Sequence, residues 1–201
     1  TIDVSIDLAA DRRPLKPEIF GVSGSPDLDR LAYPLLRWGG NSTTRYNWQA
    51  DVHNTASDWF FMNIPDGNGT ASGSGVEALM ASTLDAGSQP LLTLSTIGWT
   101  PKAVQQKRWA FSVQKYGVQL GTECSYFGSN PPAWCTPDAG NGTCNPAQNQ
   151  TGFCNANGRI VGNDPADTSD PSTPAGQSAW VDHLQQRFGN AWSNHGQVGR
   201  L

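Results

Sequence analysis

The side chains best suited to binding chemistry lie in one stretch, residues 36–48, which reads Leu-Arg-Trp-Gly-Gly-Asn-Ser-Thr-Thr-Arg-Tyr-Asn-Trp. Asn41 and Arg45 supply hydrogen-bond donors, while Tyr46 and Trp48 supply flat apolar faces. This mixture suits a neutral, polyhydroxylated ligand whose rings have one apolar side. The alternative interpretation is a strand, a Gly-Gly turn and tryptophans that belong to the core.

The acidic residues offer no clear catalytic pair. Glu77 follows Ser74 at the spacing of a capping box, which predicts a helix start, and Asp85 falls in the last turn of that helix. Asp58 precedes three aromatic residues and either binds a sugar hydroxyl or holds a loop amide, while Glu123 stands beside a cysteine. The histidines, at positions 53, 183 and 195, show no metal-ligand spacing, and Gly-x-Ser-x-Gly and phosphate-loop motifs are absent from the sequence. The sequence therefore offers side chains suited to ligand binding, and it predicts no cofactor site and no metal site.

Composition narrows the class of partner. The hydrophobic fraction is 37% and the charged fraction 15%, and the chain contains eight tryptophans, 22 glycines and 14 prolines, which indicates a loop-rich globular protein. A net charge of −4 argues against nucleic acid, which needs a clustered basic face. No apolar run approaches the roughly 20 residues of a membrane span, and we expect a signal peptide to be either absent or already removed.

The four cysteines, Cys124, Cys135, Cys144 and Cys154, lie in one stretch rich in Gly, Pro and Asn. Their spacing does not match that of a zinc site and favours two disulfides, hence an oxidising compartment. All three pairings stay open, although neighbour with neighbour is the simplest. Glycosylation sequons agree with an extracellular location; they begin at Asn68, Asn141 and Asn149. Asn41 also begins a sequon, but we expect its side chain to be packed.

Hydrophobic patterning predicts alternating strands and helices. We expect strands over residues 2–8, 19–22, 34–38 and 90–96, with another beginning at 197–201, and helices over 74–87, 109–117 and 173–189. Residues 47–65 are expected to form a long surface loop, and residues 118–170 an irregular excursion held by the cysteines. Polar and aromatic residues follow the C-terminal ends of two predicted strands, at 34–38 and 90–96, which suggests βα units around a parallel sheet or barrel.

These residues resemble glycoside hydrolase family 44. The resemblance lies in residues 37–48, in Asn54 and the Ser57-Asp58-Trp59 triplet, in the opening strand through Gly21, and in residues 90–99. It covers most of the chain apart from the cysteine-bearing excursion. It implies a secreted endo-β-1,4-glucanase that also acts on xyloglucan, needs no cofactor and is a monomer when complete.

The implied fold is α/β: the N-terminal part of a (β/α)8 TIM-type barrel, with an N-terminal strand that belongs to an accessory β-sandwich. Residues 1–22 would be that strand and the barrel entry, 34–117 the first βα units, 118–172 the excursion, and 173–201 a helix and the start of the next strand. Substrate contacts carried over from the family fall on five residues: Asn41, Arg45, Tyr46, Trp59 and Trp99.

The family's mechanism is retaining, with two glutamates about 5–5.5 Å apart, and its acid/base lies in an Asn-Glu-Pro sequence. This chain contains no Asn-Glu-Pro, and Val198 to Leu201 match the approach to it. We therefore expect a chain that stops before both catalytic glutamates and is inactive alone. The competing interpretations are a non-catalytic carbohydrate-binding protein and a disulfide-stapled structural protein.

Overall fold

The computed structural model describes residues 4–189 apart from residues 6, 8, 11, 25–26, 32, 68–73 and 104–107. The predicted strand at 197–201 and the sequon at Asn68 lie outside these residues. Of the predicted opening strand, Val4, Ser5 and Asp7 are described, and they belong to no strand. In this part of the chain no helix is long and apolar enough to cross a membrane.

A three-stranded parallel sheet carries the residues that lead to the central motif. Its order is β1 (Val22–Ser23), β2 (Leu35–Trp38) and β6 (Gln89–Leu92). The predicted strand at 34–38 is thus confirmed, whereas the one at 90–96 ends early, at Leu92. Ile19 and Phe20 lie in a 3-10 helix, η1 (Pro17–Phe20), rather than in the strand predicted for 19–22. A short helix, α1 (Leu28–Leu31), precedes β2.

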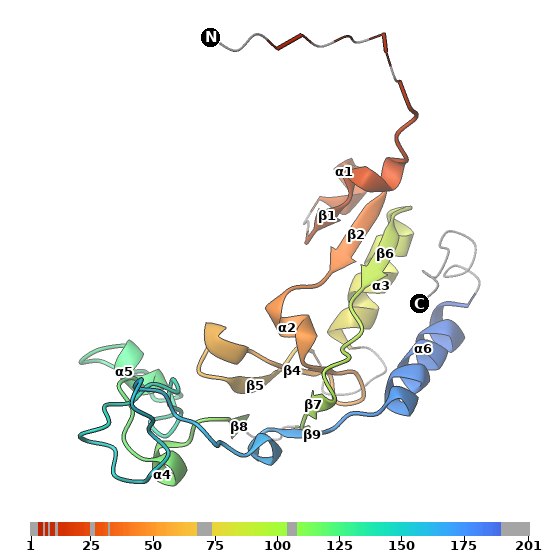
Figure 1. Ribbon diagram of the computed structural model, residues 1–201. Helices are drawn as coiled ribbons and strands as arrows, with labels where there is room; N and C mark the ends of the chain where they lie inside the picture. Colours follow the sequence, from red (N-terminus) through yellow and green to blue (C-terminus); the bar gives the residue numbers. More distant parts are fainter. Residues whose placement is uncertain are drawn as a thin grey trace.

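The helix α3 (Gly75–Asp85) precedes β6 and begins after Ser74, as the capping pattern predicts. The Ser74 hydroxyl accepts a hydrogen bond from the Glu77 backbone N–H at 3.3 Å, and this bond satisfies a free donor of the first turn. Strand β6 pairs with β2 in the parallel direction, so β2, α3 and β6 belong to a parallel strand crossover (Figure 1).

Residues 47–65 do not form the loop that we predicted. They contribute three strands to a four-stranded antiparallel sheet, in the order β3 (Tyr46–Asn47), β4 (Val52–Asn54), β5 (Met62–Pro65) and β8 (Arg108–Trp109). The short helices α2 (Asn41–Thr44) and η2 (Ala56–Asp58) connect its parts. Buried amides replace apolar side chains here: Asn54 Nδ2 donates to Asn63 Oδ1 at 2.8 Å, and both residues are fully buried.

The main core lies between α3 and α6 (Pro174–Phe188), which begins at the predicted cap Thr173 and ends at Gly189. Val76 and Met80 of α3 pack with Trp180 and Leu184 of α6, and Tyr46 completes the cluster. The Glu77 carboxylate reaches across the same junction: its Oε1 lies 2.5 Å from His183 Nε2, and its Oε2 lies 3.4 Å from Arg187 Nε. Glu77 is thus a link between two helices.

The cysteine-bearing segment forms a separate lobe at the lower left of Figure 1. It holds the short elements α4 (Val113–Tyr116), α5 (Glu123–Tyr126) and η3 (Pro165–Asp167). Its disulfides are Cys124–Cys135 and Cys144–Cys154, the simplest of the three pairings. Trp109, which we predicted to be helical, lies in β8 instead, because Ser112 caps α4 through the Lys115 backbone N–H.

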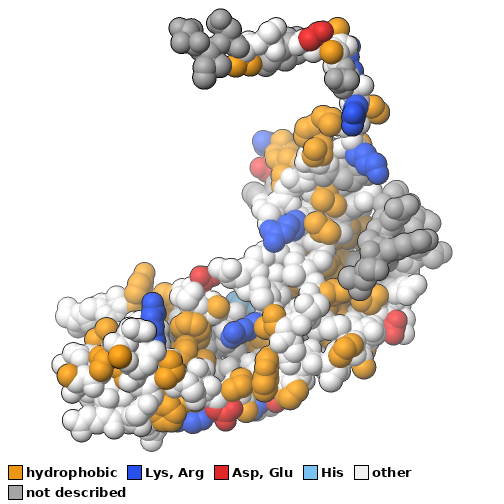
Figure 2. Space-filling view, in the orientation of Figure 1, with side chains coloured by type: hydrophobic (Ala, Val, Ile, Leu, Met, Phe, Trp, Pro, Cys, Tyr) orange, Lys and Arg blue, Asp and Glu red, His pale blue; other side chains and the backbone are white. Residues whose placement is uncertain are grey.

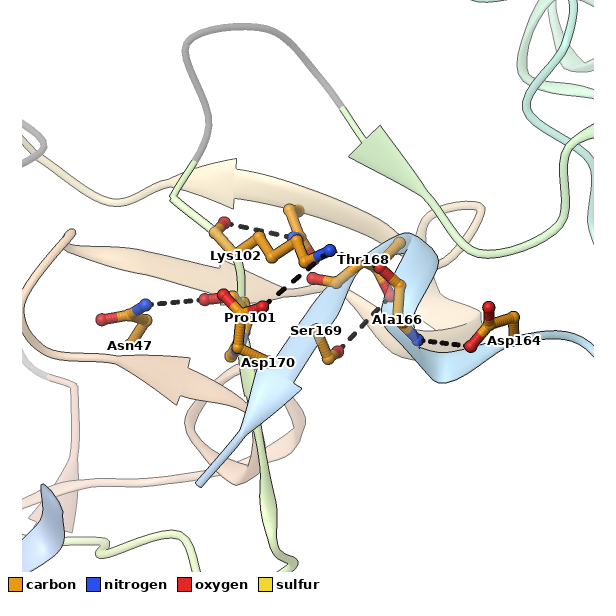
Figure 3. Close-up of polar contacts among 9 residues, drawn as sticks. Asn47, Pro101, Lys102, Asp164, Ala166, Thr168, Ser169 and Asp170 are labelled. Atoms are coloured by element: carbon orange, nitrogen blue, oxygen red, sulfur yellow. Dashed lines mark hydrogen bonds and ion pairs between the residues drawn. The ribbon is translucent and has the colours of Figure 1, made fainter. Parts of the chain in front are cut away.

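The lobe returns to the body through a two-stranded antiparallel sheet, β7 (Trp99–Pro101) with β9 (Ser169–Pro171). Polar contacts fix this return (Figure 3): Asn47 Nδ2 donates to the Pro101 carbonyl at 2.7 Å, and Lys102 Nζ donates to the Ala166 carbonyl at 2.5 Å. The observed class is α/β, with parallel and antiparallel sheets and helices.

Candidate functional site

The central motif leaves β2 through a turn that requires glycine. Gly40 has φ of 118°, in the region that residues with a Cβ avoid, and it serves as the N-cap residue of α2. Its carbonyl accepts from the Thr43 hydroxyl at 2.9 Å. The sharp turn places Asn41 at the start of α2 with its side chain exposed.

Asn41 bonds the residue just before Trp59, but its side chain is exposed rather than packed as we expected for this sequon. Its Nδ2 donates to Asp58 Oδ2 at 2.9 Å, so the two residues share one exposed polar site. The contact joins the motif to a segment 17 residues further along the chain. Amide and carboxylate together offer donors and acceptors to a hydroxyl-rich ligand.

Tyr46 has a different place from the one predicted. Its side chain is 3% exposed, and its ring centroid lies 4.9 Å from that of Trp38 and 5.6 Å from that of Trp180. Its hydroxyl donates to Asp51 Oδ1 at 2.7 Å. Burial, followed by this bond to Asp51, raises the pKa of Tyr46. In this structure Tyr46 is therefore a core residue beneath the motif.

Asp51 is fully buried and binds three parts of the chain. Besides Tyr46, its Oδ2 accepts from the Gly75 backbone N–H at 3.1 Å, at the first residue of α3, where a negative charge is favoured. Its carbonyl accepts from the Asp66 backbone N–H at 2.9 Å. Gly67 is required beside it, because a Cβ there would lie 2.4 Å from Asp51 Oδ2.

Trp59 is held by a carboxylate from the lobe. Its Nε1 donates to Glu123 Oε1 at 2.7 Å, and the Thr136 backbone N–H donates to Glu123 Oε2 at 2.7 Å. Glu123 is fully buried. Sequence patterns indicate no role for this residue, because its indole partner lies 64 residues away in the chain. The only local signal is its position beside Cys124.

A cavity of about 420 Å³ opens beside Trp59, a volume typical of small-ligand pockets. Residues 57–61 line one side, and Gly121, Thr122, Ser125, Tyr126 and Asn141 of the lobe line the other. The lining joins aromatic faces to hydroxyl, amide and carboxylate groups. Hydrophobic side chains are also exposed on the surface of this lobe, at the lower left of Figure 2.

The remaining predicted contacts lie elsewhere. Arg45 follows α2 and is partly buried, and its carbonyl accepts from the Asn54 backbone N–H at 3.0 Å. Trp99 is partly buried on β7, which packs beside β3: the Thr100 hydroxyl donates to the Tyr46 carbonyl at 3.3 Å. The structure thus brings Asn41 and the Asp58–Trp59 pair to one place and leaves Trp99 on a separate sheet.

The sequon asparagines of the lobe differ in surroundings. Asn149 is 5% exposed, and its Nδ2 donates to the carbonyls of Tyr116 and Val118 at 2.9 and 3.0 Å, so a glycan there would remove one of these two donors in an enclosed position. Asn141 is partly exposed at the cavity, and its Oδ1 accepts from the Thr143 hydroxyl at 2.7 Å. Among the residues that the structure describes, no three His, Cys, Asp or Glu side chains converge as a metal ion would require.

The model of glycoside hydrolase family 44 matches residues 52–199, about three quarters of the chain. The chain belongs to glycoside hydrolase family 44. The family match begins after the motif at 36–48 and runs through the disulfide-bonded lobe, which we had left outside the resemblance.

Solved structures and a curated protein are also similar to this chain. CelM2, a bifunctional glucanase-xylanase protein from a metagenome library, is 33% identical with a TM-score of 0.75, and the match covers 92% of this chain and 32% of CelM2. A Paenibacillus polymyxa xyloglucanase of family 44 is 28% identical over 48% of this chain and 21% of its own, with a TM-score of 0.40. The beta-mannanase/endoglucanase A of Caldicellulosiruptor saccharolyticus is 30% identical over 59 residues, which are 29% of this chain and 4% of that protein. This chain therefore spans about a third of the length of CelM2 and a smaller share of the other two proteins.

Proposed function

We propose that this chain is the substrate-positioning N-terminal part of a secreted, retaining glycoside hydrolase that cleaves β-1,4-glucans of the cellulose and xyloglucan type. The observation that carries the proposal is the match to CelM2, a glucanase-xylanase, which extends over 92% of this chain. The family 44 assignment supports the same class of reaction. In this proposal the parallel strands β1, β2 and β6 are the first strands of a (β/α)8 barrel, and residues 1–22 include a strand of an accessory β-sandwich.

The proposed domain plan follows the expected boundaries, with residues 34–117 as the first βα units, 118–172 as the excursion, and 173–201 as a helix leading to the next strand. The two disulfides support an extracellular location, because such bonds persist in oxidising compartments. The proposed glycan site is Asn68, since Asn149 is enclosed and Asn141 lines the cavity beside Trp59.

The catalytic glutamates are proposed to lie outside these 201 residues. The sequence contains three glutamates, Glu18, Glu77 and Glu123, and no Asn-Glu-Pro. Glu77 joins α3 to α6, and Glu123 holds Trp59, so both carboxylates serve the fold. A retaining enzyme needs two facing carboxyl groups, which these two engaged side chains do not supply.

Substrate binding in this chain is assigned to Asn41, Arg45, Trp59 and Trp99, with Tyr46 as a buried core residue of the same motif as Asn41. Asn41 and Asp58 would hydrogen-bond sugar hydroxyls, and the Trp59 indole would stack on the apolar face of a glucose ring. The ligand is neutral, which agrees with a site that contains one carboxylate and no cluster of charge.

The test uses the purified 201-residue chain. We expect retention on xyloglucan or soluble cellulose in affinity electrophoresis, loss of retention in Trp59→Ala, and no release of reducing ends. Sustained turnover that co-purifies with the chain and is abolished by Glu77→Gln would overturn the placement of the glutamates. Absence of retention on every β-glucan would overturn the binding role. Reading the encoding gene past Leu201 for Asn-Glu-Pro tests the barrel plan directly.

A further inference from the structure

We propose that the disulfide-bonded lobe supplies one wall of the sugar-binding cleft, with Tyr126 as a second stacking face beside Trp59, at a steep angle to it. The inference rests on the proposed function and extends it to a segment that the motif residues do not include. The ligand is a run of β-1,4-linked glucose units, which would lie in the cavity between residues 57–61 and α5.

The first argument is the geometry of the aromatic rings. The centroids of Trp59 and Tyr126 lie 5.2 Å apart with their planes at 74°, so the rings meet edge to face and form a corner. Both rings line the cavity. Tyr126 is 67% exposed, so its ring leaves a face open to a ligand. A corner of two aromatic faces suits a flat sugar ring better than either face alone.

The second argument is the polar lining. Asp58, Thr122, Ser125 and Asn141 surround the aromatic corner, and the lining contains no lysine, arginine or histidine. Hydroxyl, amide and carboxylate groups donate to and accept from the equatorial hydroxyls of glucose, while an anionic ligand would find no cation to pair with. The chemistry of the cavity thus selects a neutral polyol.

The third argument is that the lobe also fixes the orientation of Trp59. Glu123, the first residue of α5, accepts from the indole N–H, and Thr136 holds the other carboxylate oxygen. The disulfide Cys124–Cys135 joins the neighbours of these two residues. Binding costs less when the contact groups are already ordered, so the disulfide, Glu123 and Trp59 act as one preorganised unit.

Isothermal titration calorimetry with cellohexaose on the full chain tests the proposal. Tyr126→Ala should weaken binding about five- to thirtyfold, as truncation of a contact aromatic does, while Tyr126→Phe keeps the ring and should bind within about twofold of the parent. Trp134→Ala is the matched control: it removes another aromatic of the same lobe, 58% exposed and outside the cavity lining, and should leave the affinity unchanged. Maltohexaose, with α-1,4 links, should bind more weakly than cellohexaose in every variant.

The outcomes separate this inference from the function on which it rests. If Trp59→Ala abolishes binding and Tyr126→Ala leaves it intact, the assignment of Tyr126 to the cleft wall is wrong and the proposed function stands. If the parent chain binds no β-glucan, the binding role in the proposed function is overturned, and this inference with it. If Tyr126→Phe and Trp134→Ala weaken binding as much as Tyr126→Ala, the effect comes from damage to the lobe, and the inference is overturned.

Discussion

Removing each disulfide in turn should show that one bridge matters more for stability and the other more for ligand binding. The variants are Cys124→Ala with Cys135→Ala, and Cys144→Ala with Cys154→Ala. The bridges span 11 and 10 residues, so their constraint on the unfolded chain is nearly equal, about 2.7 kcal/mol each at 25 °C in the loop-entropy model. Any larger difference between the variants must come from the folded state.

The folded surroundings of the bridges differ. Cys144 is 2% exposed and packs with Tyr116 and Ile160, whereas Cys124 and Cys135 are only partly buried. Deleting a buried sulfur leaves a cavity that costs about 1 kcal/mol more. We therefore expect losses of about 4 kcal/mol for the Cys144–Cys154 pair and about 3 kcal/mol for the Cys124–Cys135 pair.

The loss of binding should follow the opposite order, because Cys124 adjoins Glu123, which accepts from the Trp59 indole, and Cys135 adjoins Thr136, which donates to Glu123. Urea unfolding without reductant measures stability, and calorimetry with cellohexaose below the transition measures affinity. The expected result is a several-fold loss of affinity in the Cys124–Cys135 variant alone. Equal affinities in both variants, or a larger loss of stability in the Cys124–Cys135 variant, would refute the reasoning.

Three further predictions concern single residues. The pKa of Tyr46 is higher in the folded protein than in the unfolded chain, so the neutral hydroxyl stabilises the fold below the unfolded pKa of about 10, and this stabilisation is lost as the pH rises beyond it. Tyr46→Phe should therefore show a smaller fall in Tm between about pH 9 and 11 than the parent. An equal fall in both proteins would contradict this. Glu77→Gln should cost about 1–2 kcal/mol in urea unfolding, because a charge-assisted bond to the partly exposed His183 becomes a neutral one, and His183→Ala in the same background should then add little. Asn149 should carry no glycan in folded protein secreted from a yeast host, as measured by peptide mass spectrometry, and occupancy there would disprove its enclosed position.

Local signals predicted the helices well. Ser74 and Thr173 stand at caps and bond the first turns of α3 and α6, and Gly189 ends α6, because these contacts involve residues three or four positions apart. The antiparallel sheet was missed because its strands are two to four residues long, too short for a period of two to be seen. Its buried positions are also filled by Asn54 and Asn63, which sequence patterns assign to loops.

The site was predictable in part for the same reason. Asn41 and Trp59 were both expected beside a substrate cleft, and Asn41 bonds Asp58 next to Trp59, but its side chain is exposed rather than packed. Tyr46 was expected to face a ligand, yet it lies between Trp38 and Trp180, and no local pattern tells a core tyrosine beside a glycine turn from an exposed one. Glu123 had no visible role because its partner comes from a distant segment.

Asp51 has a consequence for engineering. Its carbonyl and its carboxylate accept from the backbone N–H groups of Asp66 and Gly75, so two separate positions of the chain share one partner. The length of the connection between such points changes the closure free energy slowly, by about 0.6 kcal/mol for each doubling. We therefore expect added residues between Gly67 and Ser74 to leave the start of α3 unchanged, because both anchored positions keep their bonds to Asp51. The same insertion in an Asp51→Ala background should unfold at a lower urea concentration, since the two ends would no longer share a partner.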